Sequence, residues 1–127
     1  MGTMLADAVT AGGTPAADRA RSVAYEAGLD LGKKVRKDRR LRPPGAERAM
    51  AVAAEVLEDY GFEPSRTENE VSLKNCLFHA LAQHGPALVC QMNHGFLDGL
   101  MRGLGNETVQ VRLQPTDGQC CVRLRGD

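Results

Sequence analysis

Apolar residues along this chain switch between helical and strand spacing, and that switch limits the folds that the chain can adopt. From Ala20 to Tyr60 they recur at intervals of three and four residues, whereas Val71 and Leu73 alternate with polar neighbours. The first spacing gives a helix one apolar face, and the second does the same for a strand. The sequence therefore predicts helices over residues 15–35, 46–60, 77–84 and 86–104, and strands over residues 62–67, 70–74, 109–114 and 120–124.

The order of these elements indicates the fold class. N-terminal helices are followed by a ββ-αα-ββ order, which predicts an α+β fold with a small antiparallel sheet of about four strands packed on helices. Gly61 and the pair Gly105-Asn106 are the predicted stops of two helices. We expect one domain over residues 14–127, preceded by a linker or remnant over residues 1–13.

Charge balance and the lack of long apolar segments argue against several classes of protein. The chain has 16 basic and 16 acidic side chains, and a net charge of zero disfavours wholesale nucleic-acid binding. No apolar run approaches the roughly 18 residues of a membrane span, and no secretory leader is recognisable. We therefore expect a cytoplasmic protein whose four cysteines are reduced thiols, available for metal binding or reaction.

Residues 33–42, KKVRKDRRLR, carry seven of the sixteen basic residues and one acidic residue. Clustered Lys and Arg side chains gain affinity for DNA phosphates by releasing counterions. The same composition is also typical of a solvated linker with charges that suit a helix end. Both interpretations are open.

The first predicted helix carries small residues four apart, at Ala24, Gly28 and Gly32. Such a row lets another backbone approach closely. The approaching backbone could belong to a second subunit or to another element of the same domain.

Three cysteines in three predicted elements form the main candidate site. Cys76 follows the second strand, and Cys90 lies in the first turns of the helix over residues 86–104. Alternation in the last strand places Cys120 on the buried face and turns Cys121 toward solvent. Zinc and iron–sulfur clusters both favour thiolate ligands, so the three thiols are candidate metal ligands.

A histidine could complete this site. His79, three residues after Cys76, is the best fourth ligand, and His94, four residues after Cys90, is the alternative. The cysteine spacing is not of the C-x-x-C kind, and free cysteines often pack as small hydrophobic residues. A metal site, inert core thiols and a reactive redox pair are therefore all compatible with the sequence.

The apolar face of the helix over residues 86–104 offers a second candidate site. Its residues could line a pocket for an apolar effector, although such a stripe is more often plain core. Asn93 falls in the middle of this face and requires a buried partner or a ligand. The candidate ligand-binding residues are Met92, Asn93, Phe96, Leu100 and Met101.

Catalytic signatures are absent from the sequence. It contains no G-x-S-x-G, phosphate loop, H-E-x-x-H or dinucleotide fingerprint. A nucleophile built from Cys76 and His79 would need activation and an oxyanion pocket that nothing in the sequence indicates. We therefore do not expect an enzyme.

The segments VSLKNCLFHALA, LVCQMNHGFLDGLM and GQCCVRL resemble the C-terminal half of bacterial transcriptional regulators of the ArsR-like and SufR-like type. Those regulators have an N-terminal winged helix-turn-helix and a cysteine-containing sensor domain behind it. The resemblance covers about residues 15–125 and is most specific around Cys76, Cys90 and Cys120. One departure is Leu77, where the family commonly has proline.

Carried over position by position, the resemblance implies that Cys76, Cys90 and Cys120 are ligands, with Cys121 adjacent, and that they hold an iron–sulfur cluster as in the SufR-like members. It implies a sensor and dimerisation domain of a transcriptional regulator, working as a homodimer. DNA would be contacted only through a winged-helix domain that this chain lacks, and no membrane would be involved. Two other functions are compatible with the residues: an apolar small-molecule binding module with structural cysteines, and a thiol redox sensor.

Overall fold

The computed structural model describes residues 15–67, 69–74, 86–113 and 122–126. Each element in these ranges overlaps a predicted element of the same type. The predicted helix over residues 77–84 and the linker over residues 1–13 lie outside the described residues. The elements are α2 (Pro15–Asp38), α3 (Ala46–Asp59), β1 (Glu63–Arg66), β2 (Glu70–Lys74), α4 (Pro86–Gly103), β3 (Gln110–Leu113) and β4 (Val122–Arg125).

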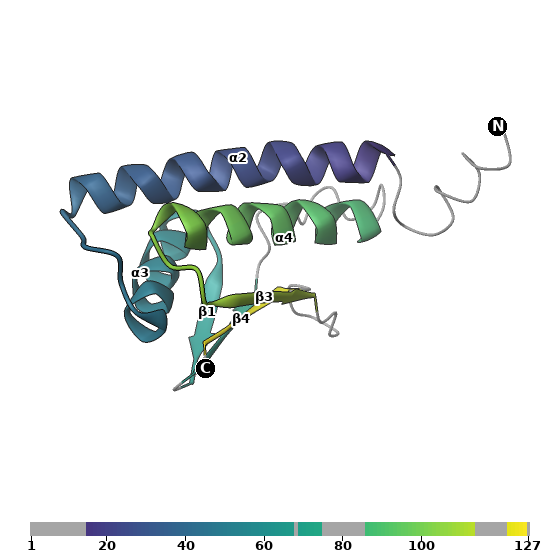
Figure 1. The fold of residues 1–127 in the computed structure, drawn as a ribbon. Helices are drawn as coiled ribbons and strands as arrows, with labels where there is room; N and C mark the ends of the chain where they lie inside the picture. The colour runs from purple at the N-terminus through teal and green to yellow at the C-terminus, as the bar shows by residue number, and fades with distance from the viewer. Residues whose placement is uncertain (1–14, 68, 75–85, 114–121, 127) are drawn as a thin grey trace, which may run out of the picture.

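The four strands form one antiparallel sheet in the order β1-β2-β4-β3 (Figure 1). Val71 of β2 pairs with Leu124 of β4, which in turn pairs with Val111 of β3. The predicted mixture of helices with a four-stranded antiparallel sheet is confirmed. The predicted ββ-αα-ββ order is not supported, because the described elements run α-α-β-β-α-β-β with α4 alone between β2 and β3.

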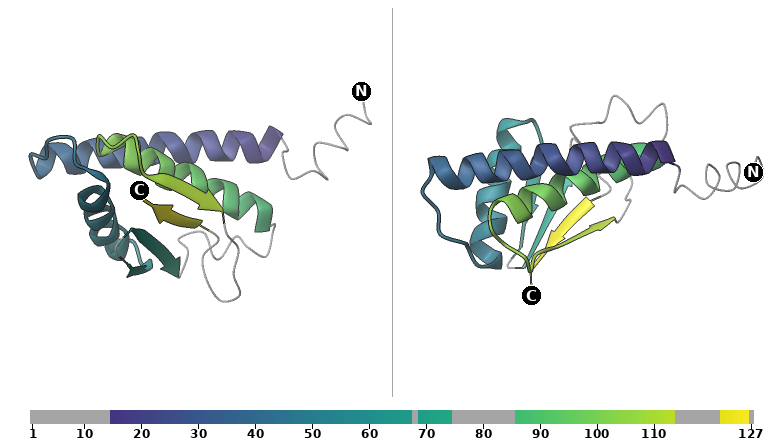
Figure 2. Two further views of the ribbon diagram at one scale, coloured as in Figure 1. Left: turned by 60° about the horizontal axis from the view of Figure 1, so that its bottom comes forward. Right: turned by 45° about the horizontal axis from the view of Figure 1, so that its top comes forward.

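Helices cover one face of the sheet. Val71, Leu73, Val122 and Leu124 are buried in the same core as the apolar residues of α3 and α4. The alternating residues Ser72, Arg123 and Arg125 are half-buried or exposed, so the other face is polar. Helix α4 lies between the sheet and α2, which forms an outer layer (Figure 2).

Helices α2 and α4 run side by side in the same direction with their backbones in close approach (Figure 1). A β-carbon added to Gly99 would lie 2.8 Å from the Leu29 amide nitrogen, and one added to Gly28 would lie 2.9 Å from that of Leu100. Both distances are too short for a carbon atom, so this packing requires glycine. The contact contains Gly28, Gly32, Gly95, Gly99 and Gly103. The small residues of α2 therefore meet another element of the same domain, the second of the two interpretations.

The three described helices end in the same hydrogen-bond pattern, in which two amides beyond the helix return to its last carbonyls. At the end of α2 the Arg40 amide donates to Lys37 O (3.2 Å), and the Leu41 amide donates to Arg36 O (2.9 Å). The residue in the left-handed conformation is a glycine after α3 and after α4, namely Gly61 and Gly105, the predicted helix stops. After α2 it is Arg40, with φ of 52°. A non-glycine residue in this conformation costs about 1–2 kcal/mol.

Asn106 fixes the turn between α4 and β3. Its Oδ1 accepts hydrogen bonds from the amides of Thr108 (2.8 Å) and Val109 (2.7 Å), and its Nδ2 donates to Pro44 O (3.0 Å). The side chain is buried, and these bonds satisfy it. The start of β3 is thereby tied both to the end of α4 and to the turn that precedes α3.

Candidate functional site

The predicted thiol ligands fall at or beyond the limits of the described residues. Cys76, Cys120 and His79 lie outside them, as do Cys121 and His84. Cys90 belongs to α4, but its side chain is not among those that the structure describes. The elements that flank these residues in sequence are described, and they fix where the cysteine-bearing segments leave the fold.

The strand ends next to Cys76 and Cys120 lie at the same edge of the sheet. β2 ends at Lys74, two residues before Cys76, and β4 begins at Val122, two residues after Cys120. Because β2 and β4 are adjacent and antiparallel, the end of one lies beside the start of the other. The pairing between them is long-range in sequence and joins two hairpins into one sheet.

The N-terminal half of α4 extends toward this edge. Arg102 Nη2 donates to Val109 O (2.7 Å), whereas His94, two turns earlier in α4, contacts Val111 O (3.1 Å) further along β3. The start of α4 therefore points toward the end of β3, at Leu113. Leu113 pairs with Val122, the first residue of β4. Cys90 is one helical turn, about 6 Å, beyond His94 in that direction. The segments that carry Cys76 and Cys120 thus leave β2 and β4 at one end of the domain, and the part of α4 that carries Cys90 extends toward the same end.

His94 is held by hydrogen bonds at both ring nitrogens. Arg21 Nε donates to Nδ1 (3.1 Å), so Nε2 carries the proton and donates to Val111 O (3.1 Å). Burial lowers the pKa of His94, and the Arg21 charge lowers it further, against opposing effects of Asp98 and of the Val111 carbonyl. The neutral ring is therefore favoured. His94 would have to give up one of these bonds to bind a metal, which makes it a poor alternative to His79.

Two arginines and a carboxylate extend this contact along α4. Asp98 accepts from Arg102 (3.1 Å) and lies 4.0 Å from Arg21 Nη2. Arg102 also donates to the carbonyls of Asn106 and Val109, both at 2.7 Å. Periodicity predicts Asp98 and Arg102 on the outer face of the helix, but their side chains are only 23% and 20% exposed. Arg21 of α2 lies against Asp98, and the segment that leads into β3 lies against Arg102. The sequence shows the i,i+4 spacing of Asp98 and Arg102. It does not show that Arg21, on another helix, lies beside Asp98.

The predicted effector-binding residues lie in the core of the domain. Leu100 and Met101 are fully buried, Phe96 is nearly so, and Met92 packs at the margin of the core. Asn93 is also fully buried. Core packing accounts for the burial of the four apolar residues, and the effector pocket stays a prediction. Hollows lined by described residues lie elsewhere, at the end of α2 and beside the start of α3.

Among the described residues, no three His, Cys, Asp or Glu side chains are grouped closely enough to hold a metal ion. None of the described helices has the length and apolar character needed to cross a bilayer. No family model, no curated protein and no solved structure matches this chain. The candidate site therefore rests on the residues and on the geometry of the flanking elements.

Proposed function

We propose that this chain is the effector-sensing domain of a transcriptional regulator, with a cysteine-centred metal or iron–sulfur site that controls DNA binding by a separate winged-helix domain. The observation that carries the proposal is the shared edge at which β2 ends, β4 begins and the N-terminal half of α4 lies. The resemblance to ArsR-like and SufR-like regulators supplies the class of protein.

Chain length limits how far the thiols can lie from this edge. Two residues span at most about 7 Å, so Cys76 stays that close to Lys74 and Cys120 that close to Val122. Cys90 belongs to a helix that approaches the same edge. Thiolates contributed by three separate elements suit zinc or an iron–sulfur cluster, and His79 would be the fourth ligand. These limits support a common site without requiring any rearrangement of the described elements.

The contact between α4 and α2 supports a role in signalling. Cys90 lies near the start of α4, and residues further along this helix touch the α2 backbone at Gly28 and Gly32. A ligand that binds Cys90 in one state of the site would favour one position of α4, and closely packed backbones shift together. In the family that the chain resembles, the DNA-binding half precedes α2, so this helix would carry the change to it.

The test is metal and sulfide analysis of the protein purified without oxygen, together with its visible absorbance. We expect one zinc ion per chain, or iron with acid-labile sulfide and cluster absorbance. Cys76→Ser, Cys90→Ser and Cys120→Ser should each lose the metal, whereas the matched control Cys121→Ser should keep it. Metal-free wild-type protein, together with unchanged stability of the Cys76→Ser and Cys90→Ser variants, would exclude the proposal. Metal-free protein that forms a disulfide among these cysteines under peroxide would instead identify a redox sensor.

A further inference from the structure

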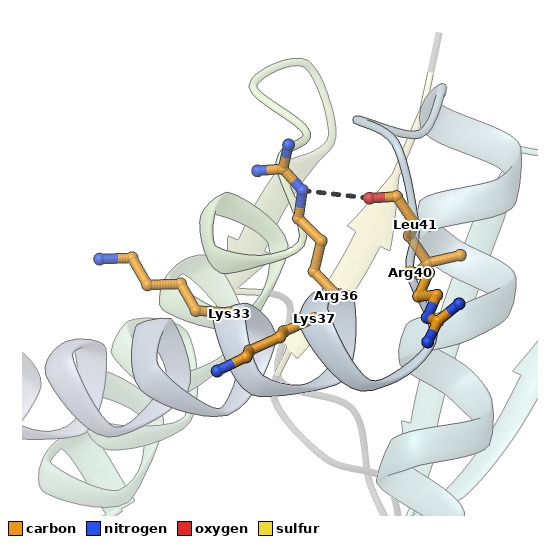
Figure 3. A pocket seen from close by; sticks show the side chains of 5 residues that line it. All are labelled: Lys33, Arg36, Lys37, Arg40 and Leu41. Atoms are coloured by element: carbon orange, nitrogen blue, oxygen red, sulfur yellow. Dashed lines mark hydrogen bonds between the residues drawn. The ribbon is translucent and has the colours of Figure 1, made fainter.

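A hollow with a basic lining lies at the C-terminal end of α2 (Figure 3). Its volume is about 600 Å³, and it opens to solvent. Lys33, Arg36, Lys37, Arg40 and Leu41 line it. The lining includes four cations, no carboxylate and a single apolar side chain. That composition suits an anion with several charges better than an apolar ligand, whose sites are mostly lined by hydrophobic and aromatic groups.

Two of the four cations are neighbours on one helix face, and a third follows the helix end. Lys33 and Lys37 are four residues apart, the spacing of neighbours on a helix surface, whereas Arg40 lies just beyond the end of α2. None of them makes an ion pair with a carboxylate within the part of the chain that the structure describes. Asp30 and Asp38 are close in sequence, but neither forms an ion pair with these cations, so the like charges of the cations still repel. An anion bound across the cations would reduce that repulsion.

Two of the other arginines of residues 33–42 are already engaged. Arg36 Nε donates to Leu41 O (3.3 Å), which holds its guanidinium at the side of the hollow (Figure 3). Arg39 points elsewhere and forms an ion pair with Glu55 (2.6 Å). The hollow therefore contains one positioned arginine and three cations whose ends remain available.

Arg40 is present against the local preference of the backbone. The equivalent positions of α3 and α4 hold Gly61 and Gly105, which adopt the left-handed conformation without strain. Cations near a helix C-terminus are favoured by the helix dipole, but Arg36 and Lys37 already provide them. The dipole therefore does not explain an arginine at the left-handed position, and this outlier motivates a role in binding.

We propose that this hollow binds the sugar-phosphate backbone of double-stranded DNA without sequence preference. Four cations gathered at the end of one helix match a polyanion, and affinity comes from the counterions that it releases. Single-stranded nucleic acids are usually held by aromatic stacking, and the lining has no aromatic side chain. Firm attachment to a membrane surface takes inserted apolar groups besides charge, whereas the large exposed hydrophobic residues of the described chain, Val23, Tyr60 and Leu113, lie outside the hollow. This contact goes beyond the expectation that only a separate domain touches DNA.

The experiment measures binding of a short fluorescein-labelled DNA duplex to the full chain by anisotropy, between about 20 and 100 mM NaCl. We expect the logarithm of the binding constant to fall with the logarithm of salt concentration with a slope between about −2.7 and −3.6, for three to four phosphates. Lys33→Gln combined with Lys37→Gln should make the slope shallower by about 1.8, and Arg40→Gly by about 0.9.

Arg40→Gly separates binding from folding. Glycine relieves the left-handed position, so this variant should melt a few degrees higher than the wild type while binding DNA more weakly. Arg19→Gln is the matched control, because it removes one charge from an exposed site on the same helix, about 30 Å from Arg40. Its slope should equal that of the wild type.

Three outcomes would overturn the proposal. They are no binding at low salt, equal losses in Arg19→Gln and Arg40→Gly, and tighter binding to duplex RNA or to anionic lipid vesicles than to duplex DNA. The result is independent of the thiol site, which lies at the other end of α4. A Cys90→Ser variant should therefore keep the wild-type salt slope whether or not the protein holds metal.

Discussion

His94 shows how the fold selects the charge state of one residue. Its ring lies half-buried between α2 and β3, accepts a hydrogen bond from a cationic side chain and donates one to a carbonyl. Protonation would replace the acceptor Nδ1 with a second donor facing the Arg21 guanidinium. Burial and, after it, the Arg21 charge disfavour the imidazolium, so the pKa of His94 is lowered and the folded protein favours the neutral form.

Stability should consequently fall in mild acid. A histidine with a lowered folded pKa contributes stability that is complete above its unfolded pKa of about 6.5 and is lost as pH falls through the folded pKa. Urea unfolding at pH 7.5 and 5.5 should show this loss in the wild type. His94→Gln, which can still donate and accept, should show a smaller loss. An unchanged pH dependence in His94→Gln would rule out this origin.

Single residues differ in how far the sequence reveals them. Gly61 and Gly105 were predictable helix stops, because glycine adopts the left-handed conformation at low cost. Arg40 occupies the same position without any sequence signal, so the predicted first helix stops at about residue 35 although α2 reaches Asp38. His94 was predicted as a possible ligand, but its partner Arg21 is 73 residues away, and local spacing cannot pair them.

Among the elements, α2 and α4 show that burial need not follow the largest apolar residues. In α2 the buried side consists of Ala24, Gly28 and Gly32, while Val23 is 65% exposed. In α4 one side faces the sheet core and the glycine side faces α2. Periodicity predicted both helices, but it could not show that the glycine side of one packs on the small side of the other.

Replacing a central glycine of this contact should destabilise the domain. Alanine is favoured over glycine by about 1 kcal/mol in a helix interior, so a glycine-to-alanine change at an exposed helix site normally stabilises a protein. Here the added carbon would meet backbone atoms of Tyr25 and Leu29, which cannot rotate away. Overpacking typically costs about 1–3 kcal/mol, and a clash with backbone should fall at the upper end of that range. After subtraction of the gain in helix propensity, we expect a net loss of about 2 kcal/mol in the free energy of unfolding.

Urea denaturation of Gly99→Ala measures this effect. Ser22→Ala, on the exposed side of α2, is the matched control and should change the free energy of unfolding by less than about 0.5 kcal/mol. If Gly99→Ala proved as stable as the wild type, the two backbones would have to lie further apart than the structure places them.

For the whole molecule, the decisive feature is the pairing of β2 with β4. Both hairpin-like pairs, β1 with β2 and β3 with β4, join strands that are neighbours in sequence. The central pairing joins strands about 50 residues apart and makes the order β1-β2-β4-β3. Strand periodicity fixes which face of each strand is buried, but it carries no information about which strands are adjacent. The shared edge near Cys76 and Cys120 therefore became apparent only in the folded chain.

A metal bound at this edge should stabilise the domain as a whole, because its ligands would join both central strands to α4. A ligand that binds only the folded state adds about 4 kcal/mol when present at a thousand times its dissociation constant. In oxygen-free urea titrations with excess zinc, the midpoint should rise, while the slope of unfolding free energy against urea should stay constant because the same surface is exposed. Cys121→Ser should show the full gain and Cys90→Ser none. A gain that persisted in Cys90→Ser would mean that zinc binds without α4, and the link from the sheet edge to α2 would be lost.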